Sequence, residues 1–218
     1  MLGGFLYVML WVSLWLFRHL WWRWTISGQS NLVPRGQGVI LAVNHLSWTD
    51  TYVLGASLPL SLKPTWLAKA ELFANPIAGR LLRGIQAIPV NRARRDLSAL
   101  IAAEEYLKQG RALIIFIEGH RSPTGGLQAG QAGAVRLALR TGCPIVPIAL
   151  WGTEAGLRGA FLRKPIRVHI GEPYRVAAET PKVPQQRINE LTDEVMLRLA
   201  ALLPERYRGV YRERIGQA

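Results

Sequence analysis

The chain has 218 residues, half of them hydrophobic, which is enough for one complete α/β domain with a sizeable core. Lys and Arg outnumber Asp and Glu by 27 to 14. The formal net charge of +13 favours an anionic partner: a phospholipid surface, a phosphorylated substrate, an acidic carrier protein or nucleic acid. The single cysteine, Cys143, excludes a disulfide within the chain and fits a reducing compartment.

The N-terminus is an uncharged apolar run, residues 2–17, followed at once by a cluster of Trp and Arg up to Trp24. A helix of that length would reach roughly 24 Å, short of the ~30 Å hydrocarbon core of a bilayer. We therefore predict that residues 1–27 are a partly inserted, membrane-anchoring helical segment with Trp and Arg among the headgroups. A tilted single span and an ordinary buried core helix are the alternatives. Deletion of residues 1–24 is expected to release the protein from membranes and to spare the fold.

Residues 28–218 are predicted to form one α/β domain, with a mainly parallel central sheet flanked by helices. Continuous apolar runs of strand length alternate with helical patterns, as expected for strands buried on both faces. The predicted strands are residues 39–43, 65–69, 85–90, 111–116, 144–150 and 166–170. The predicted helices are residues 50–57, 76–83, 96–108, 131–140 and 185–203.

The strand at 39–43 ends in Asn44-His45, and Asp50 follows five positions after the histidine. An imidazole and a carboxylate can act as a general base and the group that orients it. Residues five apart on one helix differ in direction by roughly 140°, so His45 must precede a helix whose first turn carries Asp50. The same stretch also contains Ser47-x-x-Asp50, a capping box that needs no chemistry. These residues alone leave both interpretations open.

Further polar clusters follow other predicted strands. Lys69-Ala70-Glu71-Leu72 and Arg92 lie near the ends of two of them, and Glu118-Gly119-His120-Arg121-Ser122 follows the strand at 111–116. Because open α/β sheets bind ligands at the carboxyl ends of their strands, these clusters are candidates for substrate binding. A single Lys or Arg in a loop is more often simply solvated.

Taken in order, four motifs resemble those of the glycerolipid acyltransferases, in particular the bacterial lysophosphatidic acid acyltransferases. They are Asn44-His45-x-Ser47-x-x-Asp50; Lys69-x-Glu71-Leu72 with Pro76, Gly79, Gly84 and Arg92; Phe116-Ile117-Glu118-Gly119-His120-Arg121-Ser122; and Val146-Pro147-Ile148. The resemblance covers about residues 36–170. The third motif usually reads Phe-Pro-Glu-Gly-Thr-Arg-Ser, so Ile117 and His120 depart from the family pattern.

The resemblance implies a membrane-bound 1-acylglycerol-3-phosphate O-acyltransferase of phospholipid biosynthesis. Such an enzyme moves a fatty acyl group from acyl-CoA or acyl carrier protein to the sn-2 hydroxyl of lysophosphatidic acid, forming phosphatidic acid without a cofactor. His45 would take the hydroxyl proton while Asp50 fixes the imidazole, with no acyl-enzyme. The groups expected to hold the acceptor phosphate are Lys69, Arg92 and Arg121. The residues expected to order the site or bind the acceptor are Asn44, Glu118, Gly119 and Ser122.

Glu118 cannot bind a phosphate dianion directly, so we expect it to order Arg121 or to bind the glycerol hydroxyl. Backbone amides near Gly119 are candidates for binding the oxyanion. The expected location is the cell inner membrane, with the catalytic domain on the cytoplasmic side and a monotopic or single anchor.

Three other functions compete with this interpretation. A nucleic-acid-binding protein fits the charge, but the Trp residues crowd into the apolar N-terminus and do not interleave with Lys and Arg. A metallohydrolase needs a ligand set that four His and one Cys do not offer, so we predict no metal. The main alternative is a related acyltransferase that uses another lysophospholipid or a lyso-aminolipid as acceptor.

Overall fold

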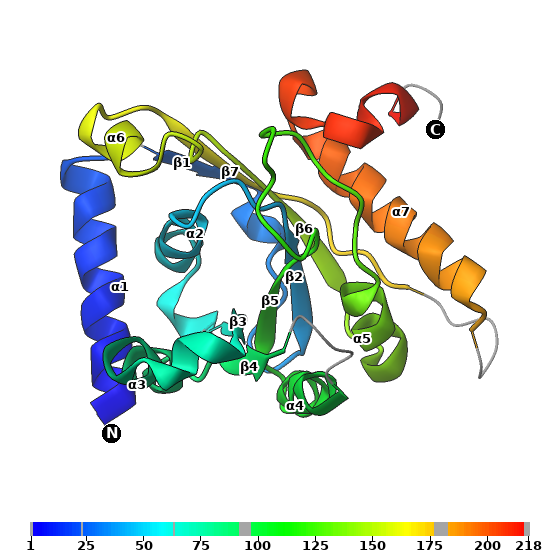
Figure 1. The fold of residues 1–218 in the computed structure, drawn as a ribbon, viewed down its shortest axis with the longest axis horizontal. Helices are drawn as coiled ribbons and strands as arrows, with labels where there is room; N and C mark the ends of the chain where they lie inside the picture. The colour runs from blue at the N-terminus through cyan, green and yellow to red at the C-terminus, as the bar shows by residue number, and fades with distance from the viewer. Residues whose placement is uncertain (1, 23, 63, 92–96, 177–182, 216–218) are drawn as a thin grey trace.

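A seven-stranded sheet with the strand order β1-β7-β6-β2-β5-β3-β4 forms the centre of the protein (Figure 1). The computed structural model describes residues 2–22, 24–62, 64–91, 97–176 and 183–215. The strands from β6 to β4 run parallel, β7 is antiparallel to β6, and β1 is parallel to β7. The strands are β1 (Trp24–Ser27), β2 (Val39–Val43), β3 (Thr65–Lys69), β4 (Ile88–Val90), β5 (Ala112–Phe116), β6 (Ile145–Trp151) and β7 (Ile166–Ile170). The predicted mainly parallel sheet is confirmed.

Helices cover both faces of this sheet. One side carries α1 (Leu2–Leu20), α2 (Asp50–Ser57), α3 (Pro76–Gly84) and α6 (Gly156–Phe161). The other side carries α4 (Leu97–Lys108), α5 (Gly133–Thr141) and α7 (Gln185–Leu202). Short 3-10 helices connect or end these elements: η1 (Gln29–Asn31), η2 (Leu60–Leu62), η3 (Ala70–Ala74), η4 (Glu205–Tyr207) and η5 (Gly209–Arg214). Residue 96, the predicted first residue of α4, lies outside the described residues.

The central strands are apolar throughout because both of their faces are covered. All five residues of β2 are buried. Ile40 and Ala42 join the core beneath α5 and α7, whereas Leu41 and Val43 join the core beneath α2. This arrangement explains why β2 reads as a continuous apolar run with no alternation of polar residues.

The chain around the end of α1 is part of the core. Trp22 and Trp24 are 4% and 6% exposed, and Trp24 starts β1, which pairs with β7. The sequence did not predict β1, and the expectation that deletion of residues 1–24 would spare the fold is wrong, because it would uncover this core. Among the described residues, no helix is both long enough and apolar enough to cross a bilayer.

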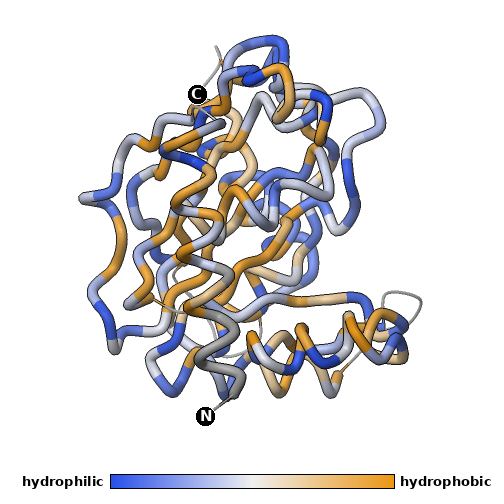
Figure 2. The backbone as a smooth tube through the Cα atoms, turned by 90° about the vertical axis from the view of Figure 1, so that its left-hand side faces the viewer, coloured by the Kyte–Doolittle hydropathy of each residue, from blue (hydrophilic) through white to orange (hydrophobic). Residues whose placement is uncertain are grey.

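Helix α1 lies on the outside of the molecule, against α2 and α3 (Figure 1). The Trp11 Nε1 donates to the Leu58 carbonyl oxygen at 3.1 Å, which ties the helix to the end of α2. Its outer surface exposes large apolar side chains: Val8, Met9, Val12, Trp15, Leu16, Phe17 and Leu20. Figure 2 looks onto this side and shows hydrophobic stretches across the middle of the view, with hydrophilic ones mostly at its margins.

We predict that Trp22→Ala lowers the free energy of unfolding by about 3–5 kcal/mol, because it empties a buried indole site. It also removes the 2.8 Å hydrogen bond from Trp22 Nε1 to the Lys164 carbonyl oxygen. Trp15→Ala is the matched control, because Trp15 is 38% exposed on α1 and its loss should cost about 1 kcal/mol or less. Chemical denaturation of both variants measures the difference. Equal losses would contradict the docking of this segment into the core.

Candidate active site

The structure brings His45 and Asp50 into contact at the carboxyl end of β2. The His45 Nδ1 lies 2.8 Å from Asp50 Oδ2, and α2 begins at Asp50. The predicted geometry, a histidine before a helix and a carboxylate in its first turn, is therefore present. Asp50 is fully buried, while the His45 side chain is 12% exposed. A positively polarised helix N-terminus favours a carboxylate at this position.

The same carboxylate oxygen also holds the turn between the two residues. Asp50 Oδ2 accepts from the backbone N–H of Leu46 at 2.7 Å and from that of Ser47 at 2.8 Å. In a capping box, the Asp50 side chain accepts from the Ser47 N–H and the Ser47 side chain accepts from the Asp50 N–H. The first of these bonds is present here, and the second is missing. Thr49 occupies the position before the helix, no side chain caps that end, and Ser47 Oγ instead accepts from Thr49. Capping and catalysis are thus compatible uses of one carboxylate.

This contact defines the protonation pattern of the imidazole. Asp50 Oδ2 already accepts hydrogen bonds from two backbone N–H groups, so we assign it as the acceptor in the contact with His45 as well. The proton of the neutral imidazole therefore lies on Nδ1. The other nitrogen, Nε2, then carries the lone pair that a general base needs. The ring is also fixed by stacking on Phe116, with 3.8 Å between centroids and 14° between planes.

Glu118 fixes the backbone of the site. Its Oε1 accepts from the His45 N–H and its Oε2 from the Gln128 N–H, both at 2.8 Å, and the residue is fully buried. Burial raises the pKa of the Glu118 carboxyl, and the two backbone hydrogen bonds oppose that shift. Glu118 therefore orders the backbone at His45 and Gln128, and the expected contacts with Arg121 or the glycerol hydroxyl stay a prediction.

Asn44 and Ser122 order the same turn from its other sides. The Asn44 amide pairs with Leu150 in both directions, at 2.7 and 2.8 Å, and so extends the contact of β2 with β6 beyond the strand. The Ser122 N–H donates to the His45 carbonyl oxygen at 2.8 Å, and its Oγ donates to the Gly126 carbonyl oxygen at 2.6 Å. Ser122 thus holds the His45 backbone and Asn44 fixes the chain directly before it, while their role in the reaction stays a prediction.

Gly119 enables the turn after β5. Its φ of 76° lies in the left-handed region, which glycine adopts without strain. Its N–H donates to the Phe116 carbonyl oxygen at 2.9 Å. That amide is already used within the turn, so it is a poor candidate for the oxyanion in this conformation.

The predicted phosphate-binding cations are only partly described. Lys69 ends β3 on the same edge of the sheet as His45 and lies 3.4 Å from Glu71, with about half of its side chain exposed. Arg121 is exposed in the loop after β5, directly before Ser122. Arg92 lies outside the described residues. The structure therefore places Lys69 and Arg121 at the same edge of the sheet as His45. That they bind one phosphate together stays a prediction.

Residues 207–210, near the C-terminus, form hydrogen bonds with the loop that carries Gln128. The sequence did not predict this contact. The Leu127 N–H donates to the Tyr207 carbonyl oxygen at 2.9 Å, and the Val210 N–H donates to the Leu127 carbonyl oxygen at 3.1 Å. A Cβ on Gly209, whose φ is 48°, would lie 2.0 Å from that Leu127 oxygen, so only glycine fits there. No sequence motif links segments so far apart.

An apolar cleft of about 250 Å³ opens beside the turn that carries Asp50. It lies between α1, α2 and α6, and its lining includes Phe17, Trp48, Thr49, Tyr52 and Leu157. Within the part of the chain that the structure describes, no group of three or more His, Cys, Asp or Glu side chains could hold a metal ion. The geometry therefore offers a base, its carboxylate and an adjoining apolar space.

Comparison with known proteins identifies the class to which this site belongs. The family model described as Acyltransferase matches residues 23–151, so the chain belongs to the acyltransferase family. A 1-acyl-sn-glycerol-3-phosphate acyltransferase of Bacillus subtilis is 30% identical over 177 residues, which cover 81% of this chain and 86% of that protein.

Two further relatives bear on the acceptor and the fold. A lyso-ornithine lipid O-acyltransferase of Pseudomonas aeruginosa is 36% identical over 127 residues, covering 57% of this chain and 46% of that one. The crystal structure of the 1-acyl-sn-glycerophosphate acyltransferase PlsC from Thermotoga maritima matches with a TM-score of 0.63 and 26% identity. That match covers 85% of this chain and 76% of the other.

We predict that Glu118→Gln destabilises the protein by about 1–3 kcal/mol, because the carboxamide sets an NH₂ group, which cannot accept, against one of the two backbone N–H donors, whereas a carboxyl keeps acceptor capacity on both oxygens in either protonation state. The loss should depend on pH. The folded-state pKa of Glu118 lies above its ordinary value of 4.5, so its stabilising contribution is complete below pH 4.5 and declines as the pH rises through the folded pKa. The difference in unfolding free energy between parent and variant should therefore shrink above pH 4.5.

Denaturant titrations at a series of pH values measure this difference. Glu172→Gln, at an exposed position, is the control and should change stability by less than about 0.5 kcal/mol. A parent-minus-variant difference that grows with pH would contradict the assignment of burial as the dominant effect on Glu118.

Proposed function

We propose that this acyltransferase moves a fatty acyl group from an acyl thioester to the sn-2 hydroxyl of lysophosphatidic acid, forming phosphatidic acid. The observation that carries the proposal is the 2.8 Å contact between His45 Nδ1 and Asp50 Oδ2 at the carboxyl end of β2. The names of the Bacillus and Thermotoga relatives support the reaction and the acceptor. Acyl-CoA and acyl carrier protein are both donors that this chemistry accommodates.

The chemical step needs one base and no covalent intermediate. His45 Nε2 takes the proton of the acceptor hydroxyl as that oxygen attacks the thioester carbonyl carbon, while Asp50 stabilises the imidazolium. The tetrahedral intermediate then collapses, the carbon–sulfur bond breaks, and the imidazolium returns the proton to the thiolate. The products are the new ester and a free thiol. General-base assistance of this kind contributes about 10²–10⁴-fold.

The acceptor phosphate is assigned to the cations on this edge of the sheet. Arg121 directly precedes Ser122, whose N–H holds the His45 carbonyl oxygen, so a phosphate on Arg121 would lie beside the catalytic turn. A guanidinium can bind two phosphate oxygens in one plane, which a lysine cannot. Lys69 and Arg92 complete the proposed set.

The proposed acceptor is a lysophospholipid, which resides in a membrane, so we propose that the protein associates with a membrane. The proposed location is the inner membrane, with the catalytic domain on its cytoplasmic side and α1 against the bilayer. The exposed apolar surface of α1 and the net charge of +13 support this proposal. Access from the bilayer avoids moving a lipid chain into water, at about 0.8 kcal/mol per CH₂.

A related acyltransferase with a lyso-ornithine lipid acceptor is the second candidate. The observation that favours it is the 36% identity to the Pseudomonas protein of that name, although over a shorter stretch. Incubation of the protein with labelled acyl thioester and a panel of lysophosphatidic acid, other lysophospholipids and lyso-ornithine lipid distinguishes the two. Preferential labelling of lyso-ornithine lipid would replace the first proposal by the second.

We predict that Asp50→Asn reduces kcat by about 10²–10⁴-fold, because the imidazole loses the acceptor that fixes its tautomer. His45→Ala should lose at least as much. Asp193→Asn is the control, since Asp193 pairs with Arg214 on the surface near the C-terminus. Steady-state acyl transfer to lysophosphatidic acid gives the measurement, and a His45→Ala variant as active as the parent would eliminate the mechanism.

We predict that Arg121→Lys raises the KM for lysophosphatidic acid about tenfold and leaves kcat within about threefold, because the charge stays but the planar fork is lost. A monoacylglycerol, which has no phosphate, provides the control acceptor. Its KM should stay the same in parent and variant. An equal rise in KM for both acceptors would remove Arg121 from phosphate binding.

A further inference from the structure

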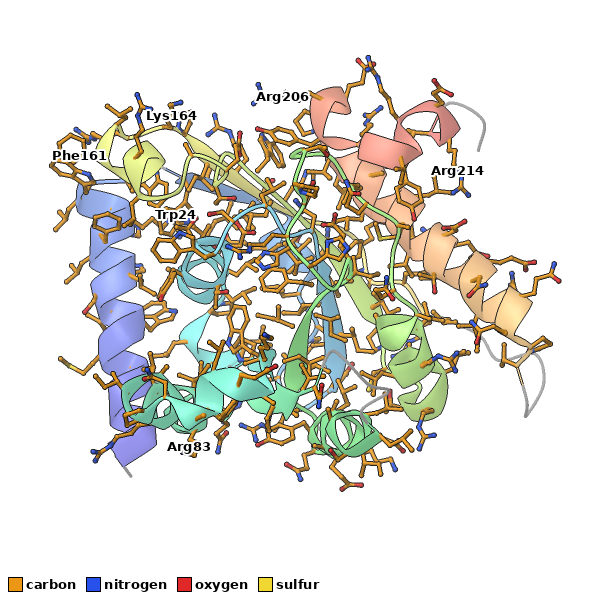
Figure 3. All side chains as sticks on the ribbon, viewed as in Figure 1. Trp24, Arg83, Phe161, Lys164, Arg206 and Arg214 are labelled. Carbon is orange, nitrogen blue, oxygen red and sulfur yellow. The ribbon has the colours of Figure 1, made fainter. Side chains whose placement is uncertain are left out.

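Helix α6 is packed with its small residues inward and its large apolar residues outward. Gly159 and Ala160 are buried, whereas Leu157, Phe161 and Leu162 are 64%, 75% and 53% exposed. A surface helix of a water-soluble domain normally turns its large apolar side chains towards the core. Figure 3 shows the Phe161 side chain pointing away from the body of the molecule at the α6 corner.

The inward face has little room for a side chain at Gly159. A Cβ on Gly159 would lie 2.8 Å from the Ala155 Cβ and 4.0 Å from the buried ring of Trp22. Ala160 is 3% exposed in the same core as Trp22 and Trp24. The two small residues therefore occupy the inward face, and Leu157, Phe161 and Leu162 lie on the exposed side.

This corner is attached firmly to the end of α1. The Trp22 Nε1 donates to the Lys164 carbonyl oxygen at 2.8 Å, and the Trp21 Nε1 donates to the Ala160 carbonyl oxygen at 3.1 Å. In return, Arg163 Nε donates to the Trp21 carbonyl oxygen at 2.9 Å. Leu20 and Trp21 are themselves 74% and 44% exposed, so the apolar surface of α1 continues onto α6.

Cations surround these apolar side chains. Arg158, Arg163 and Lys164 are exposed, and the stretch 155–164 contains no acidic residue. The preceding Glu154 accepts from the Gly152 N–H and from the Tyr207 hydroxyl, which directs it away from this corner. Apolar side chains with a basic margin and an interfacial Trp match an anionic phospholipid surface, where chains and phosphates lie at adjacent depths.

We propose that α6 and the turn after it, residues 156–164, are a second lipid contact beside α1. Leu157, Phe161 and Leu162 enter the acyl boundary of an anionic bilayer, while Arg158, Arg163 and Lys164 contact headgroup phosphates. The contact deepens the proposed function, since it sets the carboxyl edge of the sheet close to the bilayer. Leu157 and Ala160 also line the apolar cleft beside Thr49, so the contact borders the candidate site.

Sedimentation of the full chain with lipid vesicles tests the proposal. One set contains phosphatidylglycerol and phosphatidylcholine, and the other only phosphatidylcholine. The Leu157→Ser/Phe161→Ser/Leu162→Ser variant should partition at least about tenfold more weakly into either set of vesicles. The reason is that it transfers three fewer large apolar side chains from water into the bilayer. Arg158→Gln/Lys164→Gln should weaken binding only to the anionic vesicles, and this loss should diminish at high salt.

The matched control lies on the other side of the molecule. Leu97 and Ile101 on α4 are 69% and 57% exposed, so Leu97→Ser/Ile101→Ser removes similar apolar surface and should leave partitioning unchanged. Phe161→Ser alone provides a milder variant, and thermal unfolding checks that each variant folds. Parent-like partitioning of the triple variant, or an equal loss in the α4 variant, would overturn the proposal.

Acyl transfer to lysophosphatidic acid dispersed in detergent micelles separates this proposal from the function. The Phe161→Ser/Leu162→Ser variant, which leaves the cleft-lining Leu157 intact, should keep parent activity there, because the micelle delivers the acceptor without a bilayer. Loss of micellar activity in parallel with partitioning would assign the corner to the substrate site and overturn the lipid contact. A parent without activity on any acceptor would refute the proposed function alone, since the vesicle result does not depend on turnover.

Discussion

One carboxylate oxygen determines the geometry of the candidate site. Asp50 Oδ2 accepts three N–H groups, from the His45 ring and from the backbone of Leu46 and Ser47. A fully buried carboxylate is costly unless such donors and a favourable dipole surround it. Here the turn supplies two donors and the start of α2 supplies the dipole. The residue that closes the turn is therefore the same residue that orients the imidazole.

A second buried carboxylate holds the histidine from the opposite direction. Glu118 binds the His45 backbone rather than its ring and joins it to the loop at Gln128. Ile117, one of the two departures from the usual motif, is fully buried and donates its N–H to the Val43 carbonyl oxygen at 3.0 Å. A proline there would lack that donor. The isoleucine thus adds one hydrogen bond between β2 and the segment after β5.

The sequence predicted those parts of the molecule that depend on local periodicity. The central strands appear as apolar runs, and the spacing of His45 and Asp50 permits only one way for them to meet, which the structure has. Strand β1 escaped prediction because its four residues continue a Trp-rich apolar stretch that resembles an anchor. The role of Glu118 could not be predicted, because its partners are the backbone N–H groups of His45 and Gln128. Every residue except proline has such a group, so the sequence does not indicate which ones Glu118 binds. The same holds for Gly209, whose neighbour Leu127 is distant in sequence.

The distribution of charge fits the two roles that we propose for this domain, a bilayer contact and a polar reaction. Several arginines away from the α6 corner already have acidic partners: Arg140 with Glu104, Arg187 with Glu190, Arg212 with Glu205 and Arg214 with Asp193. Residues 155–164 contain cations and no acid, and they adjoin the exposed apolar side of α1. Cationic charge beside apolar surface attracts anionic lipid, whereas arginines paired with acidic residues mainly keep the surface hydrated. The chain thus combines an apolar, cationic corner with a buried turn in which Asp50 Oδ2 accepts three N–H groups, a division of roles that suits the proposed lipid acyl transfer.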